Sequence, residues 1–103
     1  MDKIYSMLGL CTKAGKLAFG ADMVLNNIKK TSLIIVCEDA SENTKNKFID
    51  IAQKNNVKII IFGNKFELSK RIGKDNKVVV GIMDDNFSKN IIKSFEDLKG
   101  AIN

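Results

Sequence analysis

Residues 33–42 run Leu-Ile-Ile-Val-Cys-Glu-Asp-Ala-Ser-Glu, and this stretch decides the fold class. The first five form a continuous apolar run rich in β-branched side chains, which is typical of a strand covered on both faces. Asp39 and Glu42 follow with the spacing of a helix capping box, and Ser41 is an alternative cap. The stretch therefore predicts a buried strand that leads directly into a helix.

The same succession of buried strands and amphipathic helices extends on both sides of this stretch. Apolar residues recur at helical spacing in the helical segments, and glycine or paired asparagine marks several of their ends. A short connection over residues 16–19 separates the first two helices. The expected helices cover residues 3–14, 21–30, 42–54, a segment around 66–72 that stops at Gly73 and a segment after 84–85, and the expected strands cover residues 33–37, 57–62 and 78–83.

The order of these elements is ααβαβαβα, which is typical of an α/β protein. Strands joined through helices are expected to be parallel, with helices on both faces of the sheet. We therefore predict a three-layer α/β/α sandwich. The 103 residues are enough for one domain and too few for two, so a single domain is expected over residues 1–103.

Two features of the sequence favour a cytoplasmic protein that has no membrane partner. No apolar run is long enough to span a bilayer, and the N-terminus lacks the basic patch and apolar core of a signal peptide. Cys11 and Cys37 do not form a C-x-x-C pair, and both lie among apolar residues. Buried free thiols are expected there rather than a disulfide.

Several kinds of catalytic and cofactor site are absent from the sequence. Without histidine the chain lacks the usual general base, the Ser-His and Cys-His pairs and the commonest zinc ligand. Gly15 and Gly20 have the spacing that opens a phosphate-binding P-loop, but Ala21 and Asp22 stand where its lysine and hydroxyl residue belong. We expect no enzyme activity, no metal and no cofactor.

Two acidic pairs, Glu38-Asp39 and Asp84-Asp85, are the remaining candidates for a catalytic or metal-binding site. Both follow expected strands, and the carboxyl ends of parallel strands are where open α/β sheets bind ligands such as Mg²⁺. Each pair also precedes an expected helix, whose N-terminus favours negative charge. Helix capping is the interpretation we prefer.

The formal net charge of +5 favours a polyanionic partner, and the excess charge is unevenly distributed. Residues 1–32 hold five lysines and two acids, and residues 57–83 hold six basic and two acidic residues. The stretch between these blocks, residues 33–56, and the C-terminal stretch, residues 84–103, are slightly acidic. The sequence thus has two basic blocks, which a fold can bring together.

Several segments resemble one known family. They include Leu-Gly-Leu at 8–10, Ala-Gly-Lys-Leu at 14–17, Gly-Ala-Asp-Met-Val at 20–24, Glu-Asp-Ala-Ser-Glu-Asn-Thr-Lys at 38–45 and Phe-Glu-Leu-Ser-Lys-Arg-Ile-Gly at 66–73. In this order they resemble the L-seven-Ae superfamily of ribosomal and RNA-folding proteins, and most closely its bacterial YlxQ-type branch. The resemblance covers nearly the whole chain and also implies the α/β/α sandwich.

The resemblance implies binding of kink-turn RNA. In the superfamily the second helix enters the widened groove at tandem G·A pairs, and the loop before the last strand covers the bulged nucleotides. On this sequence the two regions are residues 20–26 and 73–77, which the fold would bring to one end. The implied RNA-binding residues are Lys16, Gly20, Ala21, Asp22, Met23, Asn26, Ser41, Lys45, Gly73, Lys74, Asp75, Asn76 and Lys77, and Lys13, Lys29 and Lys30 would widen the footprint.

The second helix departs from the family pattern of Gly-X-Asn-Glu with a lysine three residues later. Asp22 replaces the Asn, Met23 replaces the Glu and Asn26 replaces the Lys. Asp22 can stand in for the missing Glu as an acceptor for a guanine amino group, or it can serve only as an acidic first-turn residue. Gly20 likewise either lets the backbone approach RNA or only begins the helix.

The resemblance and the charge together predict a protein that binds structured, kink-turn-like RNA, with ribosomal RNA or the ribosome as a further expected partner. We expect the free protein to be a monomer. The alternative is a protein-interaction module on the same fold that does not bind RNA specifically.

Overall fold

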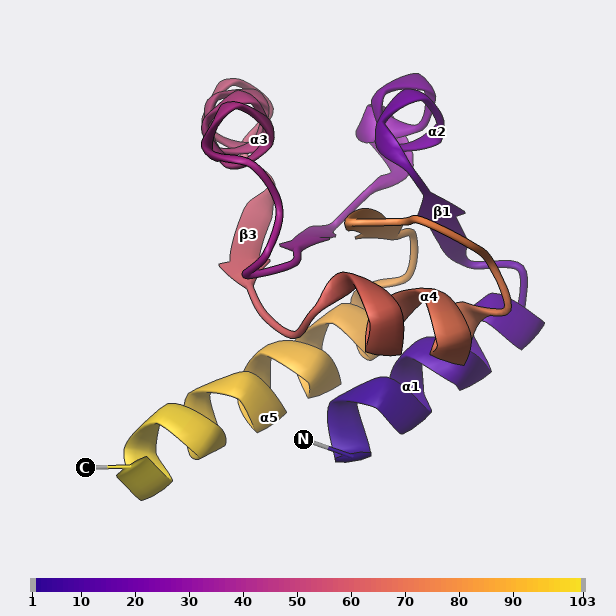
Figure 1. The fold of residues 1–103 in the computed structure, drawn as a ribbon, viewed down its shortest axis with the longest axis vertical. Coiled ribbons are helices and arrows are strands. Elements are labelled where there is room, and N and C mark those ends of the chain that lie inside the picture. Colours follow the sequence, from indigo (N-terminus) through magenta and orange to yellow (C-terminus); the bar gives the residue numbers. More distant parts are fainter. Residues whose placement is uncertain (1, 103) are drawn as a thin grey trace.

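The computed structural model describes residues 2–102, with side chains placed for residues 3–100. Figure 1 shows a sheet with helices above and below it. In chain order the elements are α1 (Asp2–Lys13), β1 (Leu17–Phe19), α2 (Ala21–Asn26), a single 3₁₀ turn (Ile28–Lys30), β2 (Leu33–Val36), α3 (Glu42–Lys54), β3 (Lys58–Ile61), α4 (Lys65–Ile72), β4 (Val79–Ile82) and α5 (Asp85–Ile102).

The predicted three-layer sandwich is confirmed. Helices α2 and α3 cover one face of the sheet, and α1, α4 and α5 cover the other (Figure 1). Alternate residues of β2 therefore enter different apolar clusters: Leu33 and Ile35 pack with α1, α4 and α5, whereas Ile34 and Val36 pack with α2 and α3. Burial on both faces explains why the strand sequence is apolar without interruption. Within residues 2–102, no helix has the length and apolar character required to cross a bilayer.

The sheet contains one strand that the sequence did not predict. Residues 17–19, expected to be a connection, form β1, which pairs with β4 through Leu17 opposite Ile82 and Phe19 opposite Val80. Three residues carry too little periodicity to indicate a strand, so only the partner strand defines it. The strand order is β1-β4-β2-β3.

The expectation that all strands are parallel is wrong. Strands β2 and β3 are parallel, but β4 is antiparallel to both β1 and β2. Helix α4 has eight residues, so it is about 12 Å long and can carry the chain across two strand spacings of about 5 Å each. The chain then enters β4 at the same end of the sheet where it left β3, and no return crossover is needed.

Helix capping, the preferred interpretation of the acidic pairs, holds for Asp84 at α5, whereas Asp39 contacts the start of α4 and not of α3, the helix that follows it. The two pairs lie at opposite ends of the sheet. Asp39 accepts a hydrogen bond from the Lys65 N–H at the start of α4, at 3.0 Å. Asp84 accepts one from the Phe87 N–H in the first turn of α5, at 2.9 Å. Because β4 is antiparallel to β2, the two pairs cannot form one carboxylate site. Among the described residues, no group of three acidic or sulfur side chains could hold a metal ion.

Local helix signals were predicted more accurately than strand direction. Ser41, the alternative cap, begins α3 by accepting a hydrogen bond from the Thr44 N–H at 3.1 Å, so the Asp39–Glu42 capping box does not form. Gly73 ends α4 in the left-handed conformation, with φ of 71°. The second helix ends earlier than expected, at Asn26, because a separate 3₁₀ turn covers residues 28–30.

Both cysteines are buried free thiols, as predicted. Burial raises the pKa of Cys37 to about 12, with a smaller contribution from the nearby carboxylates of Asp39 and Glu38. Burial also raises the pKa of Cys11 to about 11, and Asp84 adds to the shift. Neither thiol forms the thiolate at neutral pH, so both act as small apolar core residues.

Candidate nucleic-acid interface

One end of the sheet gathers most of the predicted site. Strands β1, β2 and β3 finish there and β4 begins there, because β4 alone runs the other way. We call it the loop end. Gly20 follows β1 at this end, Ser41 follows β2, and the 73–77 loop leads into β4 (Figure 1). The fold thus places Gly20, at the start of α2, beside the 73–77 loop, as the family resemblance implied.

Gly20 occupies a backbone conformation that other residues avoid. Its φ of 82° and ψ of 161° lie in a region that is essentially restricted to glycine. Its N–H donates to the Val79 carbonyl at 2.9 Å, and its carbonyl accepts from the Val24 N–H at 3.1 Å. Gly20 therefore continues the β1–β4 pairing and begins α2 at the same time. A Cβ at this position would lie 3.6 Å from the Lys77 side chain.

The 73–77 loop is held by Ser69 of α4. Ser69 is only 6% exposed, and its hydroxyl accepts a hydrogen bond from the Lys77 N–H at 2.9 Å and donates one to the Lys77 carbonyl at 3.2 Å. The Lys74 N–H donates to the Ser69 carbonyl at 2.9 Å. Asn76 has a φ of 54°, which asparagine tolerates better than most residues. Ser69 therefore fixes both ends of the loop relative to α4.

Two lysines of this loop converge on Phe19, the last residue of β1. The Lys74 ammonium lies 4.5 Å from the centroid of the Phe19 ring, and the Lys77 ammonium lies 5.8 Å from it. Cation–π attraction accounts for both positions. We call Phe19, Gly20, Lys74 and Lys77 the basic platform. It combines two lysine ammonium groups, an aromatic ring and a glycine with no side chain to obstruct a close approach.

Ser69→Ala is expected to lower the free energy of unfolding by about 1–3 kcal/mol, because two hydrogen bonds to the Lys77 backbone are lost. Urea denaturation measures this change. Ser6→Ala, which removes an exposed serine from α1, is the matched control and should change stability by less than about 0.5 kcal/mol. Equal stability of the two variants would show that Ser69 does not hold the loop.

The residues of α2 differ in how far their side chains are exposed to solvent. Asp22 is exposed, and Ala21 is half-buried against the α2–α3 side of the core. Met23 is also half-buried, and its sulfur accepts a hydrogen bond from the Phe19 N–H at 3.4 Å. Asn26 is exposed at the end of the helix. Asp22 therefore presents a carboxylate acceptor to solvent at the start of α2, while Met23 is used within the fold.

The profile of the ribosomal protein L7Ae/L30e/S12e/Gadd45 family matches residues 2–92 of the chain. The chain belongs to this family. Two curated relatives agree, and each is named RNA-binding protein YlxQ. The one from Enterococcus faecium is 36% identical over 89 residues, which cover 84% of this chain and 85% of the relative. The one from Bacillus subtilis (strain 168) is 32% identical over 90 residues, which cover 85% of this chain and 90% of the relative.

Solved structures show the same L7Ae-like fold. A protein with unknown function from Bacillus halodurans superposes with a TM-score of 0.85 and 30% identity, covering 90% of this chain and 96% of that one. The Giardia lamblia 15.5kD RNA binding protein superposes with a TM-score of 0.71 and 15% identity, covering 93% of this chain and 84% of that one. At that identity the second comparison shows the shared fold alone. Both comparisons confirm the sandwich predicted from the sequence.

The expectation that both basic blocks meet at one end of this L7Ae-family chain is only partly right. Lys16 precedes β1, and its carbonyl accepts a hydrogen bond from the Met83 N–H at 2.8 Å, beyond the last residue of β4. It is therefore at the end opposite the basic platform. The three residues of β1 separate it from Gly20, a backbone span of about 13 Å over four residue steps. Lys13, at the end of α1, lies close to Lys16 in the chain.

Lys29 and Lys30 also lie away from the basic platform. They form the 3₁₀ turn that leads into β2, and the Ser32 N–H donates a hydrogen bond to the Ile82 carbonyl at 2.8 Å. This pairing places them at the start of β2, opposite the loop end. The first basic block therefore contributes Phe19 and Gly20 to the platform. These four lysines of the block do not belong to the platform: Lys13, Lys16, Lys29 and Lys30.

Ser41 and Lys45 lie at the loop end, where α3 begins. The Ser41 hydroxyl accepts from the Thr44 N–H and donates to Thr44 Oγ1 at 2.9 Å, so the cap already uses it. The Lys45 ammonium lies 3.8 Å from a Glu42 carboxylate oxygen, and its side chain is 20% exposed. Their roles in RNA binding remain predictions.

Sequence reasoning missed Phe19 and Ser69. The signal for Phe19 was an aromatic residue directly before Gly20 in a basic block, and aromatic residues next to cations are common where proteins contact nucleic acid. Ser69 gave no comparable signal. Its importance comes from contacts with Lys77, eight residues further along the chain.

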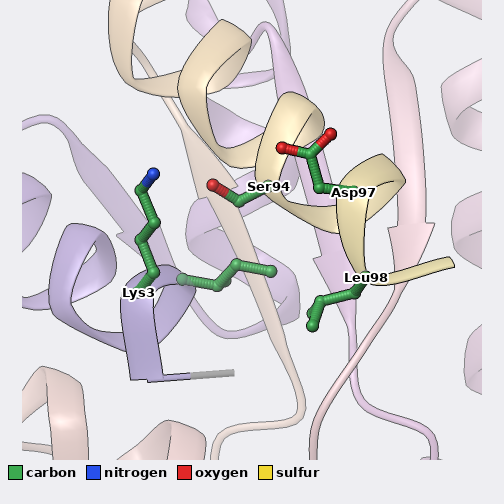
Figure 2. Close-up of a pocket in the computed structure, with 5 residues that line it drawn as sticks. Lys3, Ser94, Asp97 and Leu98 are labelled. Carbon is green, nitrogen blue, oxygen red and sulfur yellow. The ribbon is translucent and has the colours of Figure 1, made fainter. Parts of the chain in front are cut away.

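A separate hollow of about 210 Å³ lies between α1 and the C-terminal half of α5. Figure 2 shows Lys3 of α1 facing Ser94, Asp97 and Leu98 of α5 across it. Neither helix contributes to the basic platform. A sequence without histidine cannot provide Ser94 with the usual base, so this hollow does not resemble an acyl-transfer site.

Proposed function

We propose that the protein binds structured RNA through the basic platform and the exposed start of α2. The observation that carries the proposal is the convergence of Lys74 and Lys77 on Phe19, directly beside Gly20. Long lysine side chains can leave the ring to reach phosphates, and the glycine allows a nucleic-acid backbone to come close.

RNA is the polyanion favoured by the relatives, because both curated relatives are named as RNA-binding proteins and neither name denotes a reaction. A helical stem with a kink-turn or a similar distortion is the target we propose. The widened groove of such a stem admits α2, and the 73–77 loop covers the adjoining unpaired nucleotides. Ribosomal RNA, within or outside the ribosome, is the source we propose for such a stem.

The exposure of the α2 residues decides how a base edge could be contacted. The Met23 sulfur accepts from the Phe19 N–H and the side chain packs against the core, so Met23 is not a hydrogen-bonding reader. Asp22 is exposed and carries two acceptor oxygens. We therefore propose that Asp22 accepts hydrogen bonds from a guanine amino group in place of the family's Glu.

The proposal is tested by binding to a labelled kink-turn RNA and to a plain RNA duplex of equal length, each at two salt concentrations. Binding to both that weakens with salt supports phosphate contacts, and tighter binding to the kink-turn supports recognition of the distorted stem. Equal affinity for the two RNAs would limit the function to general stem binding. Absence of binding to either RNA would favour a protein-interaction module.

Asp22→Ala removes the proposed acceptor and is expected to weaken binding by about 1–3 kcal/mol for RNA with tandem G·A pairs. Asp22→Asn keeps one acceptor oxygen and removes a negative charge close to phosphate, so this variant should bind as well as the wild type or better. Affinities for stems with G·A pairs and with ordinary pairs provide the measurement.

Thermal melts of the same variants separate affinity from stability. A carboxylate that only favours the helix N-terminus contributes about 0.3–1 kcal/mol to stability and nothing to base discrimination. If both Asp22 variants keep the wild-type affinities for both stems, the proposed contact with guanine is wrong.

A further inference from the structure

Two hollows lie between α1 and α5, which pack side by side (Figure 1). Their volumes are about 210 and about 360 Å³, and they share Lys3, Ser94 and Asp97, so they form one continuous groove. Figure 2 shows the smaller hollow. We call the whole the α1–α5 groove. It has an apolar, buried or half-buried part and an exposed, charged rim, formed respectively by Ile4, Met7 and Leu98 and by Lys3, Lys93 and Asp97.

Leu10 extends the apolar part of this groove along α1. It follows Met7 by three residues and Lys3 by seven, so the three side chains lie on one side of the helix. Leu10 is 57% exposed. Helix α4 packs against a different side of α1, where a Cβ on Gly9 would lie 3.8 Å from the Arg71 carbonyl oxygen. A single exposed leucine is ordinary, but one that continues an apolar groove enlarges the surface that a partner can cover.

The walls of the groove favour a helix as the occupant. Both walls are helices whose backbone N–H and C=O groups already bond within the helix, so they offer none to an extended segment. A partner helix satisfies its own backbone and needs only side chains that fit the groove. Helix α1 has 12 residues and is about 18 Å long, enough to contact three turns of a partner helix. Apolar side chains at i, i+3 or i+4, and i+7 of that helix would meet Leu98, Met7 and Leu10 in turn.

Charge decides what else the partner helix must carry. Lys3 and Lys93 lie on opposite walls, and neither forms an ion pair within the described part of the chain. Acidic residues on both flanks of the apolar stripe would therefore meet a lysine on each wall. RNA would also suit the lysines, but its phosphates would lie against Met7 and Leu10. The net charge of +5 disfavours a second copy of this chain as the occupant.

We propose that the α1–α5 groove binds an amphipathic, acidic helix of a partner protein. The groove belongs to the helix layer on the opposite face of the sheet from α2, and none of its residues is part of the basic platform (Figure 1). The chain can therefore hold RNA and a second protein at the same time. This inference goes beyond the proposed function and does not depend on it.

The test uses a fluorescein-labelled helical peptide of about 18 residues, with leucines at three- and four-residue spacing and glutamates on both flanks. The wild type should bind it saturably and should not bind a scrambled peptide of the same composition. Leu10→Ala should weaken binding by about tenfold, because the partner helix covers this leucine. Phe66→Ala removes an exposed apolar side chain from α4, outside the groove, and is the matched control that should leave binding unchanged.

Charge reversal provides a second readout. Replacing Lys3 and Lys93 together with glutamate should weaken binding of the acidic peptide by about tenfold. A peptide with lysine in place of each glutamate should then prefer this variant to the wild type. Amide NMR shifts caused by the acidic peptide should lie in α1 and α5 and spare the 73–77 loop.

Four outcomes would overturn the proposal: no saturable binding of the acidic peptide, equal binding by Leu10→Ala, displacement of the peptide by stem RNA, or self-association of the wild type that Leu10→Ala abolishes. Displacement would assign the groove to RNA, and self-association would show that a second copy covers it. Peptide binding that persists in a protein unable to bind stem RNA would keep the groove and reject the proposed function.

Discussion

Replacing Gly63 with alanine is expected to lower the free energy of unfolding by about 2–6 kcal/mol, a large fraction of the stability of a domain of this size. Gly63 has a φ of 77°, which costs a residue with a side chain about 1–3 kcal/mol. In addition, an alanine Cβ would lie 2.5 Å from the hydroxyl oxygen of Tyr5, a buried residue of α1. Overpacking of this kind adds about 1–3 kcal/mol. Urea denaturation measures the sum as a shift in midpoint.

Two further variants separate the backbone and the steric contributions to the expected loss of unfolding free energy. Gly15 has a φ of 71°, and a Cβ at this position would meet nothing within 4 Å, so Gly15→Ala reports the cost of the backbone alone. Tyr5→Phe removes the hydroxyl that the new methyl group would meet. In a double-mutant cycle, Tyr5→Phe should recover part of the loss caused by Gly63→Ala. A loss at Gly63 no greater than that at Gly15, with no recovery, would contradict the steric contribution.

Replacing both Lys74 and Lys77 with alanine should give the largest change in RNA binding. If each lysine neutralises one phosphate on duplex RNA, the slope of log affinity against log salt should fall in magnitude by about 1.8. Between about 50 mM and about 200 mM salt, the wild type should therefore lose about twelvefold more affinity than the variant does. Titrations at four or more salt concentrations provide the slope. The melting temperature should change little, because the cation–π contacts of these side chains with the Phe19 ring contribute only about 0.5–1 kcal/mol each.

Lys89 and Lys93 provide a control that changes the net charge by the same amount. Both are exposed on α5, on the opposite side of the sheet from α2. Replacing this pair with alanine should alter the salt slope much less, since the side chains lie outside the proposed footprint. Equal slopes for the two double variants would show that net charge, rather than the basic platform, governs binding.

Most helices and the three longest strands could be predicted because their signals are local. Apolar periodicity placed α1, α3 and α5 within a few residues, and Gly73 ended α4 where a left-handed residue was expected. Ser41 could be proposed as a cap because capping depends on residues three apart. In the site, the positions of Gly20 and the 73–77 loop followed from the family resemblance.

The residues that the sequence did not assign to the site depend on contacts between distant segments. Phe19 carries the platform because Lys74 and Lys77 reach its ring, and Ser69 holds Lys77 by its backbone. Leu10 was part of a recognised family segment, but its exposure beside the α1–α5 groove could not be foreseen, since leucine is among the residues most often buried.

The sequence by itself determined the α/β class, the burial of the three longest strands and most helix boundaries, although not the end of α2, because those properties depend on side chains and their near neighbours. Strand direction was decided only in the tertiary structure. A strand buried on both faces is uniformly apolar whichever way it runs, so residues 78–83 gave no sign that β4 is antiparallel. That direction placed Lys74 and Lys77 beside Gly20 and left Lys16 at the other end of the sheet. The lysines could be counted along the chain. Which of them lie together was decided by hydrogen-bonded pairing between strands that are far apart in the sequence.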